Sequence, residues 1–343
     1  MTPTPTPTPT PAPAPPATRP AVQPMPAAAL FKAATPAAQT VGMSASPKVV
    51  AVLPPPPPFQ IQTLTDSDRW IKMLIYGGYG SGKTRLCGTA AAVPYMRDVL
   101  FVNCEAGDLT LMTEEEALTA EDKKHIDVIR VSSYKTLARV HEFLKAHCMF
   151  RDLPFEEGEP KLKQLEIKLF PQADPKAPAR RYQTLIMDSI TEAETFSMYS
   201  LLSITDATRL DEETQAPEWA EYKKNNSQLL RLSRAMRDLP MNLLMTAASS
   251  YIQNEAKQFI YQPALTGKLA KQIQGFMDVV GFLHVVPGEN NTRVHRMLAH
   301  PTPRVDAKCR FSNFKRPYWD DPTMRSILES VGLIQQLSQK SKV

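Results

Sequence analysis

From about residue 61 onward, short apolar runs alternate with stretches in which apolar residues recur every three or four positions. The short runs, rich in β-branched and aromatic residues, predict buried strands, and the longer spacing predicts amphipathic helices. Strands are expected at residues 71–76, 98–105, 126–131, 182–189, 241–248, 277–286, 293–299 and 304–311. Helices are expected from residue 84, over 133–148, 190–202, 218–239 and 267–274, and from residue 321. This alternation predicts an α/β fold with a mainly parallel sheet and additional C-terminal strands.

Two of the predicted helices carry ring side chains whose positions follow from the pattern. In residues 133–148, His141 and His147 flank the apolar face at a spacing that keeps them apart. We therefore expect surface or edge histidines rather than metal ligands. In residues 218–239, Trp219 and Tyr222 continue the apolar stripe, so we expect them to pack in the core rather than stack on bases.

Three stretches show neither the short apolar runs of strands nor the spacing of amphipathic helices. Residues 106–126 are acidic and are expected to be irregular. Residues 151–181 combine prolines with mixed charge, which predicts an inserted loop or hairpin. Residues 249–266 are polar and are expected to form a loop.

The first 60 residues are not expected to form a folded domain. More than half of the 32 prolines lie there, and no acidic residue does. Proline removes hydrogen-bond donors and favours polyproline II, so we expect a stiff, disordered arm. A spacer is favoured over a docking site for a proline-binding partner. The expected organisation is an arm over 1–60, a folded domain over 61–315, and a C-terminal helix and tail over 316–343.

The composition of the 343 residues limits the possible partners. Hydrophobic residues make up 43% of the chain, and a net charge of +5 permits a nucleic-acid partner without requiring one. The four cysteines have no paired spacing, which predicts reduced thiols rather than a disulfide or zinc framework. No apolar run has the length of a membrane span and no signal-peptide pattern opens the chain, so we expect no membrane partner and a cytoplasmic location.

The stretch after the first predicted strand carries the strongest chemical signal. Gly77, Gly82, Lys83 and Thr84 form the pattern Gly, four residues, Gly-Lys-Thr. Glycines allow the backbone N–H groups to turn inward, and these donors, with the N-terminus of the next helix, can cradle a polyphosphate. We therefore predict a phosphate-binding loop for ATP. The expected nucleotide-binding residues are Gly77, Gly78, Tyr79, Gly80, Ser81, Gly82, Lys83, Thr84 and Arg85.

A second strand ends in a carboxylate suited to the metal that accompanies ATP. Asp188 follows the apolar run of residues 182–187, which is the form of a Walker B site. Behind a phosphate loop, such a carboxylate is expected to bind Mg²⁺ together with the Thr84 hydroxyl. Lys83 is expected to reach the β- and γ-phosphates and to act in catalysis.

These motifs resemble the RecA-type ATPases. Glu105 ends the strand after the phosphate-loop helix, and in RecA-type proteins a glutamate at that place activates the attacking water. In AAA+ proteins the catalytic glutamate directly follows the Walker B aspartate. Here Ser189 follows it, which argues against the AAA+ arrangement. The resemblance implies a RecA-like P-loop NTPase core, a Mg²⁺-dependent ATPase with Glu105 as general base.

The C-terminal half extends this resemblance. Residues 263–268, 276–283 and 306–310 are similar to phage nucleotide-binding proteins of the RecA superfamily, among them the Sak-type single-strand-annealing ATPases. Lys308 and Arg310 resemble the Lys-x-Arg pair of the DnaB and RadA relatives, which reaches the neighbouring subunit's nucleotide as an arginine finger. The alternative is that both side chains are exposed to water on a surface strand and have no catalytic role. For a phage-encoded protein, the expected location is the cytoplasm of the host cell.

In these relatives a histidine or glutamine often ends the strand corresponding to residues 241–248 and senses the γ-phosphate. This chain has neither there, so Thr246 or Ser249 is the candidate for that role.

The resemblance implies an ATP-dependent recombination protein that binds single-stranded DNA and promotes annealing or strand exchange. RecA-type proteins bind DNA through loops at the place of residues 249–271. Lys257, Lys268 and Lys271 would contact phosphates there, and Tyr251 or Tyr261 could stack on bases.

Further expected partners are copies of the same chain, in a ring or filament, and a single-strand-binding protein. The alternative function is a helicase-like motor or loader, or a nucleotide-dependent assembly switch with little DNA affinity. The proline arm supplies no additional DNA-processing domain, which favours recombination.

Overall fold

A computed structural model describes residues 70–169, 174, 176–253 and 257–333. The chain divides into residues 1–61 and 62–343, and every described residue belongs to the second unit. The expected proline arm, 1–60, lies outside the described residues. So does the end of the expected C-terminal tail, residues 334–343.

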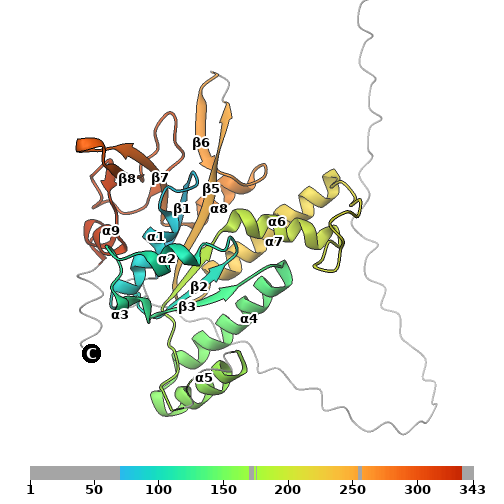
Figure 1. Cartoon of the computed structure of the whole chain (residues 1–343), viewed down its shortest axis with the longest axis vertical. Coiled ribbons are helices and arrows are strands. Elements are labelled where there is room, and N and C mark those ends of the chain that lie inside the picture. Colours follow the sequence, from blue (N-terminus) through green and yellow to red (C-terminus); the bar gives the residue numbers. More distant parts are fainter. Residues whose placement is uncertain (1–69, 170–173, 175, 254–256, 334–343) are drawn as a thin grey trace, which may run out of the picture. The chain divides into compact units, whose positions relative to one another are not determined.

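The described unit is built on one mixed sheet with the order β10-β8-β7-β1-β5-β4-β2-β3 (Figure 1). The strands around its centre are parallel: β7 (Val279–Pro287), β1 (Lys72–Gly77), β5 (Asn242–Gln253), β4 (Thr184–Asp188), β2 (Val99–Asn103) and β3 (Ile126–Arg130). Antiparallel strands follow toward the C-terminus: β8 (Arg293–Leu298), β9 (Lys308–Cys309) and β10 (Tyr318–Asp320). The predicted α/β fold with a mainly parallel sheet and C-terminal strands is confirmed.

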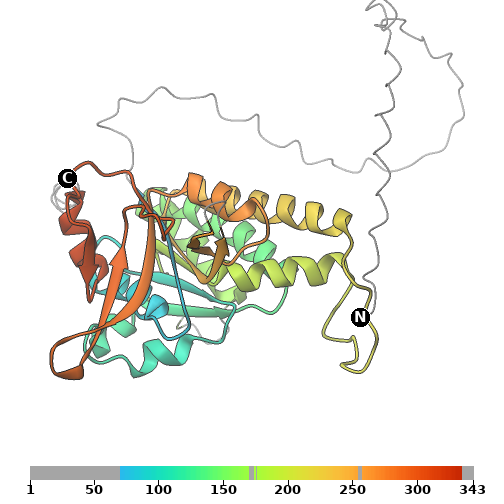
Figure 2. The same cartoon turned by 90° about the horizontal axis from the view of Figure 1, so that it is seen from above.

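Helices cover both faces of this sheet (Figures 1 and 2), because its strands are apolar on both sides. In β1, Met73 and Ile75 belong to one core, and Leu74 and Tyr76 to the other. The first core includes α1 (Lys83–Gly88), η1 (Thr89–Ala92), α2 (Asp108–Thr113) and α9 (Met324–Ser330). The second includes α4 (Tyr134–Arg151), α6 (Ile190–Leu201), α7 (Trp219–Arg237) and α8 (Leu269–Phe276). Shorter or peripheral helices are α3 (Ala120–Lys123), α5 (Phe155–Leu169) and η2 (Glu289–Asn291).

Side-chain caps explain where several of the predicted helices begin. The hydroxyls of Ser133, Ser189 and Thr323 each accept a hydrogen bond from the backbone N–H three residues later. Such caps satisfy N–H groups that have no partner inside the helix. The Ser189 cap places the start of α6 directly behind Asp188.

Two stretches expected to lack regular structure are helical. Residues 106–126 contain α2 and α3, and Leu111 in α2 and Leu118 between the two helices are buried in the same core as α1. Residues 151–181 contain α5, with Pro160 inside it. Gly158 of α5 lies so close to α4 that a Cβ would approach the Phe150 carbonyl oxygen to 2.4 Å. This tertiary packing outweighs the proline and the mixed charge that hid the helix.

The expected polar loop over residues 249–266 is a hairpin. Strand β5 continues past the sheet to Gln253 and pairs with β6 (Phe259–Pro263). Tyr251 lies opposite Tyr261, and Ile252 lies opposite Ile260. Cross-strand pairs of aromatic and β-branched residues stabilise a hairpin. Because the paired residues are not neighbours in the sequence, the local pattern did not predict these strands.

Several expected positions were wrong. Trp219 is 74% exposed rather than in the core, and Tyr222 is also exposed. His147, expected at the surface or an edge, is buried with its Nε2 3.0 Å from the Arg180 carbonyl oxygen. Burial lowers the pKa of His147 to about 4, so the ring is neutral. Of residues 304–311, only Lys308–Cys309 form a strand.

The structure also places the cysteines and the closing helix. The four cysteines are free, and Cys87 and Cys148 are buried. Met324, Ile327 and Leu328 of α9 are buried in the core. No helix in the described residues is both long and apolar enough to cross a membrane.

Candidate phosphate and metal site

The loop from β1 to α1 lies at the edge of the sheet where the parallel strands end. Gly77 closes β1, and Lys83 begins α1. A side chain at Gly77 is impossible, since a Cβ would approach the Leu283 carbonyl oxygen to 2.1 Å. Gly82 has φ 92°, a conformation open mainly to glycine. Two glycines of the motif are thus required by this backbone path.

Two polar side chains of the loop are buried beside it. The Ser81 hydroxyl has no hydrogen-bond partner among the described residues, although it is buried. The Lys83 ammonium donates to the carbonyl oxygens of Gly77 and Gly78 at 3.1 and 3.0 Å. Burial lowers the pKa of Lys83, and the charges of Glu105 and Asp188 act in the opposite direction. A buried hydroxyl in need of a partner and a buried cation suit a phosphate ligand.

Two of the predicted nucleotide-binding side chains are less buried than Ser81 and Lys83. Tyr79 is 90% exposed. The Arg85 guanidinium pairs with Glu114 at 2.6 Å and with Glu116 at 3.2 Å. The acidic segment of residues 114–116 therefore holds Arg85, and its contact with a nucleotide stays a prediction.

The predicted metal-binding pair is brought together by sheet order. Thr84 Oγ1 donates to Asp188 Oδ2 at 2.7 Å, and Asp188 is only 1% exposed. On its other oxygen, Asp188 accepts a hydrogen bond from the Thr246 hydroxyl. Thr246 reaches it because β5 lies between β1 and β4. A carboxylate and a hydroxyl fit Mg²⁺, which takes few protein oxygens and leaves room for water and phosphate oxygens.

Glu105 lies beside this pair, two residues past the end of β2. The Ser189 hydroxyl donates to Glu105 Oε1, and the Cys104 N–H donates to the Asp188 carbonyl oxygen at 2.7 Å. Asn103 shapes the turn, because its Oδ1 accepts the Gly107 N–H at 3.0 Å. The turn therefore sets the predicted general base next to the Walker B strand.

Sequence reasoning missed several residues of this site. Ser189 was considered only as the neighbour of Asp188, and Asn103 lay inside the predicted strand of residues 98–105, but nothing showed which side chain they bind. Glu192 lies on the first turn of α6, where burial first and then the charge of Glu105 raise its pKa. It is a second carboxylate near Glu105, and its spacing four residues after Asp188 was the available signal. His295, from β8, contacts Ser81 and had no sequence signal.

The thiols near the site are not nucleophiles. Burial raises the pKa of Cys104 to about 12 and that of Cys87 well above its usual range, and the Asp188 charge adds to both shifts. A thiol with such a pKa is protonated at neutral pH, and only the thiolate attacks. The chemistry of the site therefore depends on carboxylates, hydroxyls and Lys83.

The predicted arginine-finger residues lie near the beginning of the parallel strands, at the end of the sheet opposite the phosphate loop. Lys308 donates to the carbonyl oxygens of Gln274 and Gly275 at 3.1 and 3.3 Å, and Arg310 pairs with Asp278 at 3.1 Å. Asp278 in turn accepts the N–H of Lys72, at the start of β1. The six residues of β1 span about 16–20 Å, beyond the reach of an arginine side chain. Within one subunit, neither cation reaches the phosphate loop.

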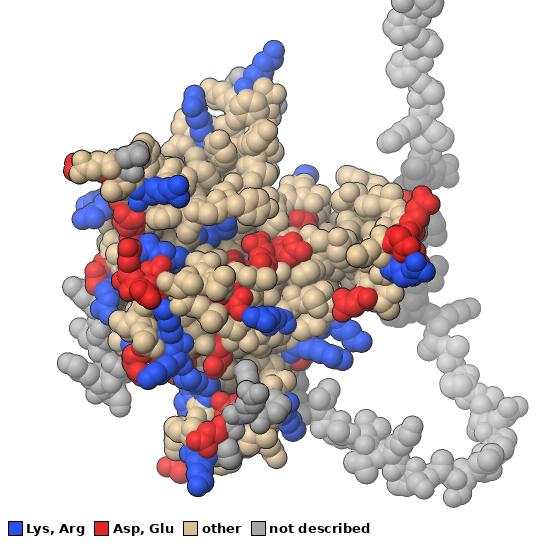
Figure 3. Space-filling view, in the orientation of Figure 1, with Lys and Arg blue, Asp and Glu red and all other residues tan. Residues whose placement is uncertain are grey.

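The predicted DNA-binding lysines are separated by the hairpin. Lys257 lies near the tip, between β5 and β6, while Lys268 and Lys271 lie at the start of α8. All three are exposed, and Lys271 is 3.8 Å from Asp306 in an ion pair. On the face shown in Figure 3, the described surface of the hairpin is uncharged or basic.

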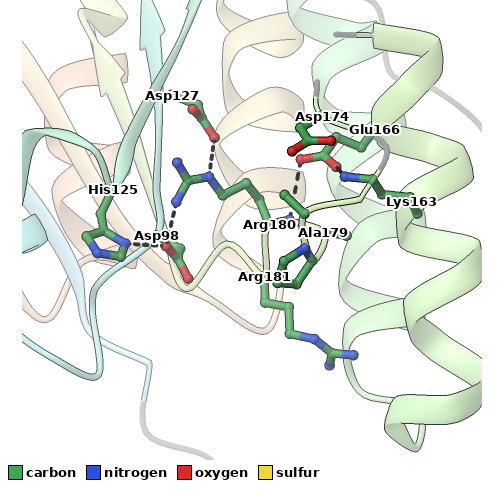
Figure 4. A pocket seen from close by; sticks show the side chains of 11 residues that line it. Asp98, His125, Asp127, Lys163, Glu166, Asp174, Ala179, Arg180 and Arg181 are labelled. Carbon is green, nitrogen blue, oxygen red and sulfur yellow. Dashed lines mark hydrogen bonds and ion pairs between the residues drawn. The ribbon is translucent and has the colours of Figure 1, made fainter. Parts of the chain in front are cut away.

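A cavity of about 680 Å³ lies away from this site, where the parallel strands begin (Figure 4). Arg180 bonds to both Asp98 and Asp127, and His125 lies 2.8 Å from Asp98. These groups pair with one another across the starts of β2 and β3 and the segment after α5. We therefore attribute the charged lining of this cavity to an ion-pair network that holds α5 in place.

Comparisons with known proteins show one family that covers most of the described chain. The model of a family described as AAA domain matches residues 69–311. A search of curated protein sequences found no match. Among solved structures, the flagellar accessory protein FlaH from Methanocaldococcus jannaschii is similar at 13% identity, covering 66% of this chain and 76% of its own, with a TM-score of 0.32. The RadB recombinase is similar at 17% identity, covering 66% and 79%, with a TM-score of 0.33.

Proposed function

Because this chain belongs to the family described as AAA domain, we propose that it is a Mg²⁺-dependent ATPase that binds single-stranded DNA and promotes annealing or strand exchange. The ATPase part is supported by the phosphate loop with Lys83, Thr84 and Asp188 at one edge of the sheet. In this family member Ser189, not a glutamate, follows Asp188, so the catalytic carboxylate is assigned to Glu105.

In this proposal each polar residue has a separate task. The loop and Lys83 bind the β- and γ-phosphates, and Thr84 and Asp188 hold Mg²⁺, which offsets phosphate charge. Glu105, oriented by the Ser189 hydroxyl, accepts a proton from the attacking water. Thr246 links β5 to Asp188, so a movement of β5 changes the position of the metal-binding carboxylate.

The DNA part rests on one observation, a series of rings that leads from the exposed hairpin to the phosphate-loop strand. Tyr251 is 65% exposed, and its ring centroid lies 6.5 Å from that of Tyr261. Tyr261 stacks on Phe282 at 5.3 Å, and Phe282 lies 5.2 Å from Tyr76. Tyr76 directly precedes Gly77. Bases stack on exposed aromatic rings, so strand binding at the hairpin would act on the residue next to the loop.

This proposal predicts two separable contributions to DNA affinity. Tyr251→Ala should weaken binding of a single-stranded oligonucleotide about 5- to 150-fold, the range for one lost base-stacking contact, without changing its salt dependence. Neutralising Lys257, Lys268 and Lys271 together should flatten the slope of log affinity against log salt by about two, at roughly 0.7 per phosphate contact. Fluorescence anisotropy over a salt series measures both.

Trp219→Ala is the matched control, because it removes an exposed aromatic ring from α7, outside the hairpin. It should leave DNA affinity unchanged. If Tyr251→Ala and the triple variant bind DNA like the wild type, the hairpin is not the DNA site. Absence of DNA binding by the wild type itself would favour the nucleotide-dependent assembly switch.

We further propose that the RecA-like resemblance extends to assembly, with Lys308 and Arg310 acting on the nucleotide of a neighbouring subunit. Within one subunit they bind carbonyl oxygens at the end of α8, a position that also suits cations without any catalytic role. A single-strand-binding protein and a phage origin remain parts of the Sak-type resemblance on which this proposal draws.

A mixing experiment distinguishes the two roles. Arg310→Ala keeps its phosphate loop, and Lys83→Ala keeps its finger residues, so each alone should hydrolyse ATP poorly. In a random equal mixture, about a quarter of the interfaces join a working loop to a working finger, and about a quarter of wild-type turnover should return. If no activity returns although crosslinking verifies mixed assembly, Lys308 and Arg310 only bind the carbonyl oxygens at the end of α8 and do not act on a neighbouring nucleotide.

A further inference from the structure

The phosphate loop is contacted by a strand that lies more than 200 residues away in the sequence. The Nδ1 atom of His295, on β8, lies 2.9 Å from the carbonyl oxygen of Ser81. A carbonyl oxygen only accepts hydrogen bonds, so Nδ1 must carry a proton and donate it. His295 thus holds the backbone of the loop directly, one residue before Gly82.

The His295 ring also packs against the last glycine of the loop. A Cβ at Gly82 would lie 3.0 Å from Nδ1 and 3.3 Å from Cε1 of His295. Glycine is therefore required at position 82 for two reasons: its φ is positive, and the His295 ring approaches where a side chain would lie.

His295 is itself fixed by the C-terminal strands. Its N–H donates to Asp321 Oδ1 at 2.9 Å, and its carbonyl oxygen accepts the Asp321 N–H at 2.6 Å. The adjacent Arg296 binds Asp320 through two hydrogen bonds of 2.6 and 2.9 Å. Three residues past Asp321, the Met324 N–H donates to the Thr89 hydroxyl at 2.8 Å. The segment that carries the ring is therefore anchored both to its neighbour strand and to the end of the phosphate-loop helix.

The direction of one peptide group gives this contact its consequence. In a trans peptide, the C=O and the following N–H point in opposite directions. With the Ser81 carbonyl held toward β8, the N–H of Gly82 must point away from β8. The bond from His295 thereby fixes the direction of one backbone donor of the loop.

From this geometry we propose that His295 is a positioning residue for the nucleotide: it holds the Ser81–Gly82 peptide so that the Gly82 N–H meets a phosphate oxygen. The inference rests on the proposed ATPase function and adds the C-terminal strands to the nucleotide site. Because the contact persists whether the phosphate is in the ground or transition state, its loss should weaken binding without slowing the chemical step.

Substitutions of His295 that differ in donor capacity test this. His295→Leu keeps much of the volume and removes the donor, and ATP should bind about 3- to 10-fold more weakly, the equivalent of one hydrogen bond. KM should rise by the same factor while kcat stays within about twofold. His295→Asn can place an N–H near the position of Nδ1 and should retain most of the affinity. Amide exchange should quicken in residues 78–84 of the Leu variant but not in β4.

Two controls keep the test decisive. His300→Leu makes the same change just beyond β8, where the ring stacks on Phe314 and does not touch the loop, and should bind ATP normally. If His295→Leu does not fold, His295→Asn and His295→Val replace it, since both are uncharged and only Asn has a donor.

The outcomes separate this inference from the proposed function. Weaker binding by the Leu or Val variant, with affinity retained in the Asn variant, supports it. Wild-type affinity in the Leu or Val variant, or equal loss in Asn, overturns it. Lys83→Ala run in parallel should lose affinity in either case. If that variant binds ATP normally, the nucleotide site itself is wrong.

Discussion

Replacing Glu105 with Gln is expected to slow ATP hydrolysis about 10²- to 10⁴-fold while leaving ATP binding intact, the effect of losing a general base. Gln keeps the shape of the side chain and an oxygen that can accept the Ser189 hydrogen bond. What it loses is the capacity to take a proton from water. Single-turnover hydrolysis and fluorescent-ATP titration, performed on the same preparation, measure the two effects separately.

Glu192→Gln is the informative companion, because Glu192 is the other nearby carboxylate and its pKa is raised by burial and by the Glu105 charge. We expect it to retain turnover within a few-fold. Asp188→Asn should instead raise the Mg²⁺ concentration needed for activity, because Asp188 accepts the Thr84 hydroxyl in the metal pair. Normal hydrolysis by Glu105→Gln together with slow hydrolysis by Glu192→Gln would identify Glu192, on α6, as the general base instead of Glu105.

The second large effect is expected from Lys83→Ala. The ammonium is buried and bonded to two loop carbonyls, so its removal deletes both a charge-assisted phosphate contact and a brace of the loop. One such contact contributes roughly 1.5–3 kcal/mol, which corresponds to about 10- to 150-fold weaker ATP binding. Fluorescent-ATP titration measures the loss, and turnover should fall with it.

Lys124→Ala provides the control, since it removes an exposed lysine that pairs only with Glu121 among the described contacts. Surface pairs of this kind contribute little, so neither binding nor melting temperature should change measurably. Unchanged affinity and turnover in Lys83→Ala would contradict the phosphate-loop assignment, provided that circular dichroism shows both variants folded.

The position of Glu105, the predicted base, shows why the residue next to Asp188 was informative but incomplete. Because Ser189 follows Asp188, no glutamate stands in that place. This did not show that the serine hydroxyl itself would bind Glu105, which lies 84 residues earlier, just after β2. This contact depends on β2 and β4 being neighbours in the sheet, and strand order is decided by packing of whole layers rather than by local pattern.

Local sequence was least reliable where a segment's structure depends on a distant partner. The hairpin of β5 and β6 reads as a polar loop because its strands stabilise each other only after they pair. Trp219 continues the apolar stripe of α7, yet its turn of the helix is exposed. A stripe predicts which face is apolar and does not predict how far along the helix the partner layer extends.

By itself, the sequence determined the alternation of strands and helices, the phosphate loop and the strand that ends in Asp188. These are local features, because periodicity and glycine conformational freedom act over a few neighbouring residues. Tertiary structure alone decided the contacts across strands: Thr84 with Asp188, Ser189 with Glu105, Thr246 with Asp188, and His295 with Ser81. It also placed Lys308 and Arg310 at the far edge of the sheet. Such contacts follow from the order and direction of the strands, which depend on how both apolar faces are buried at once.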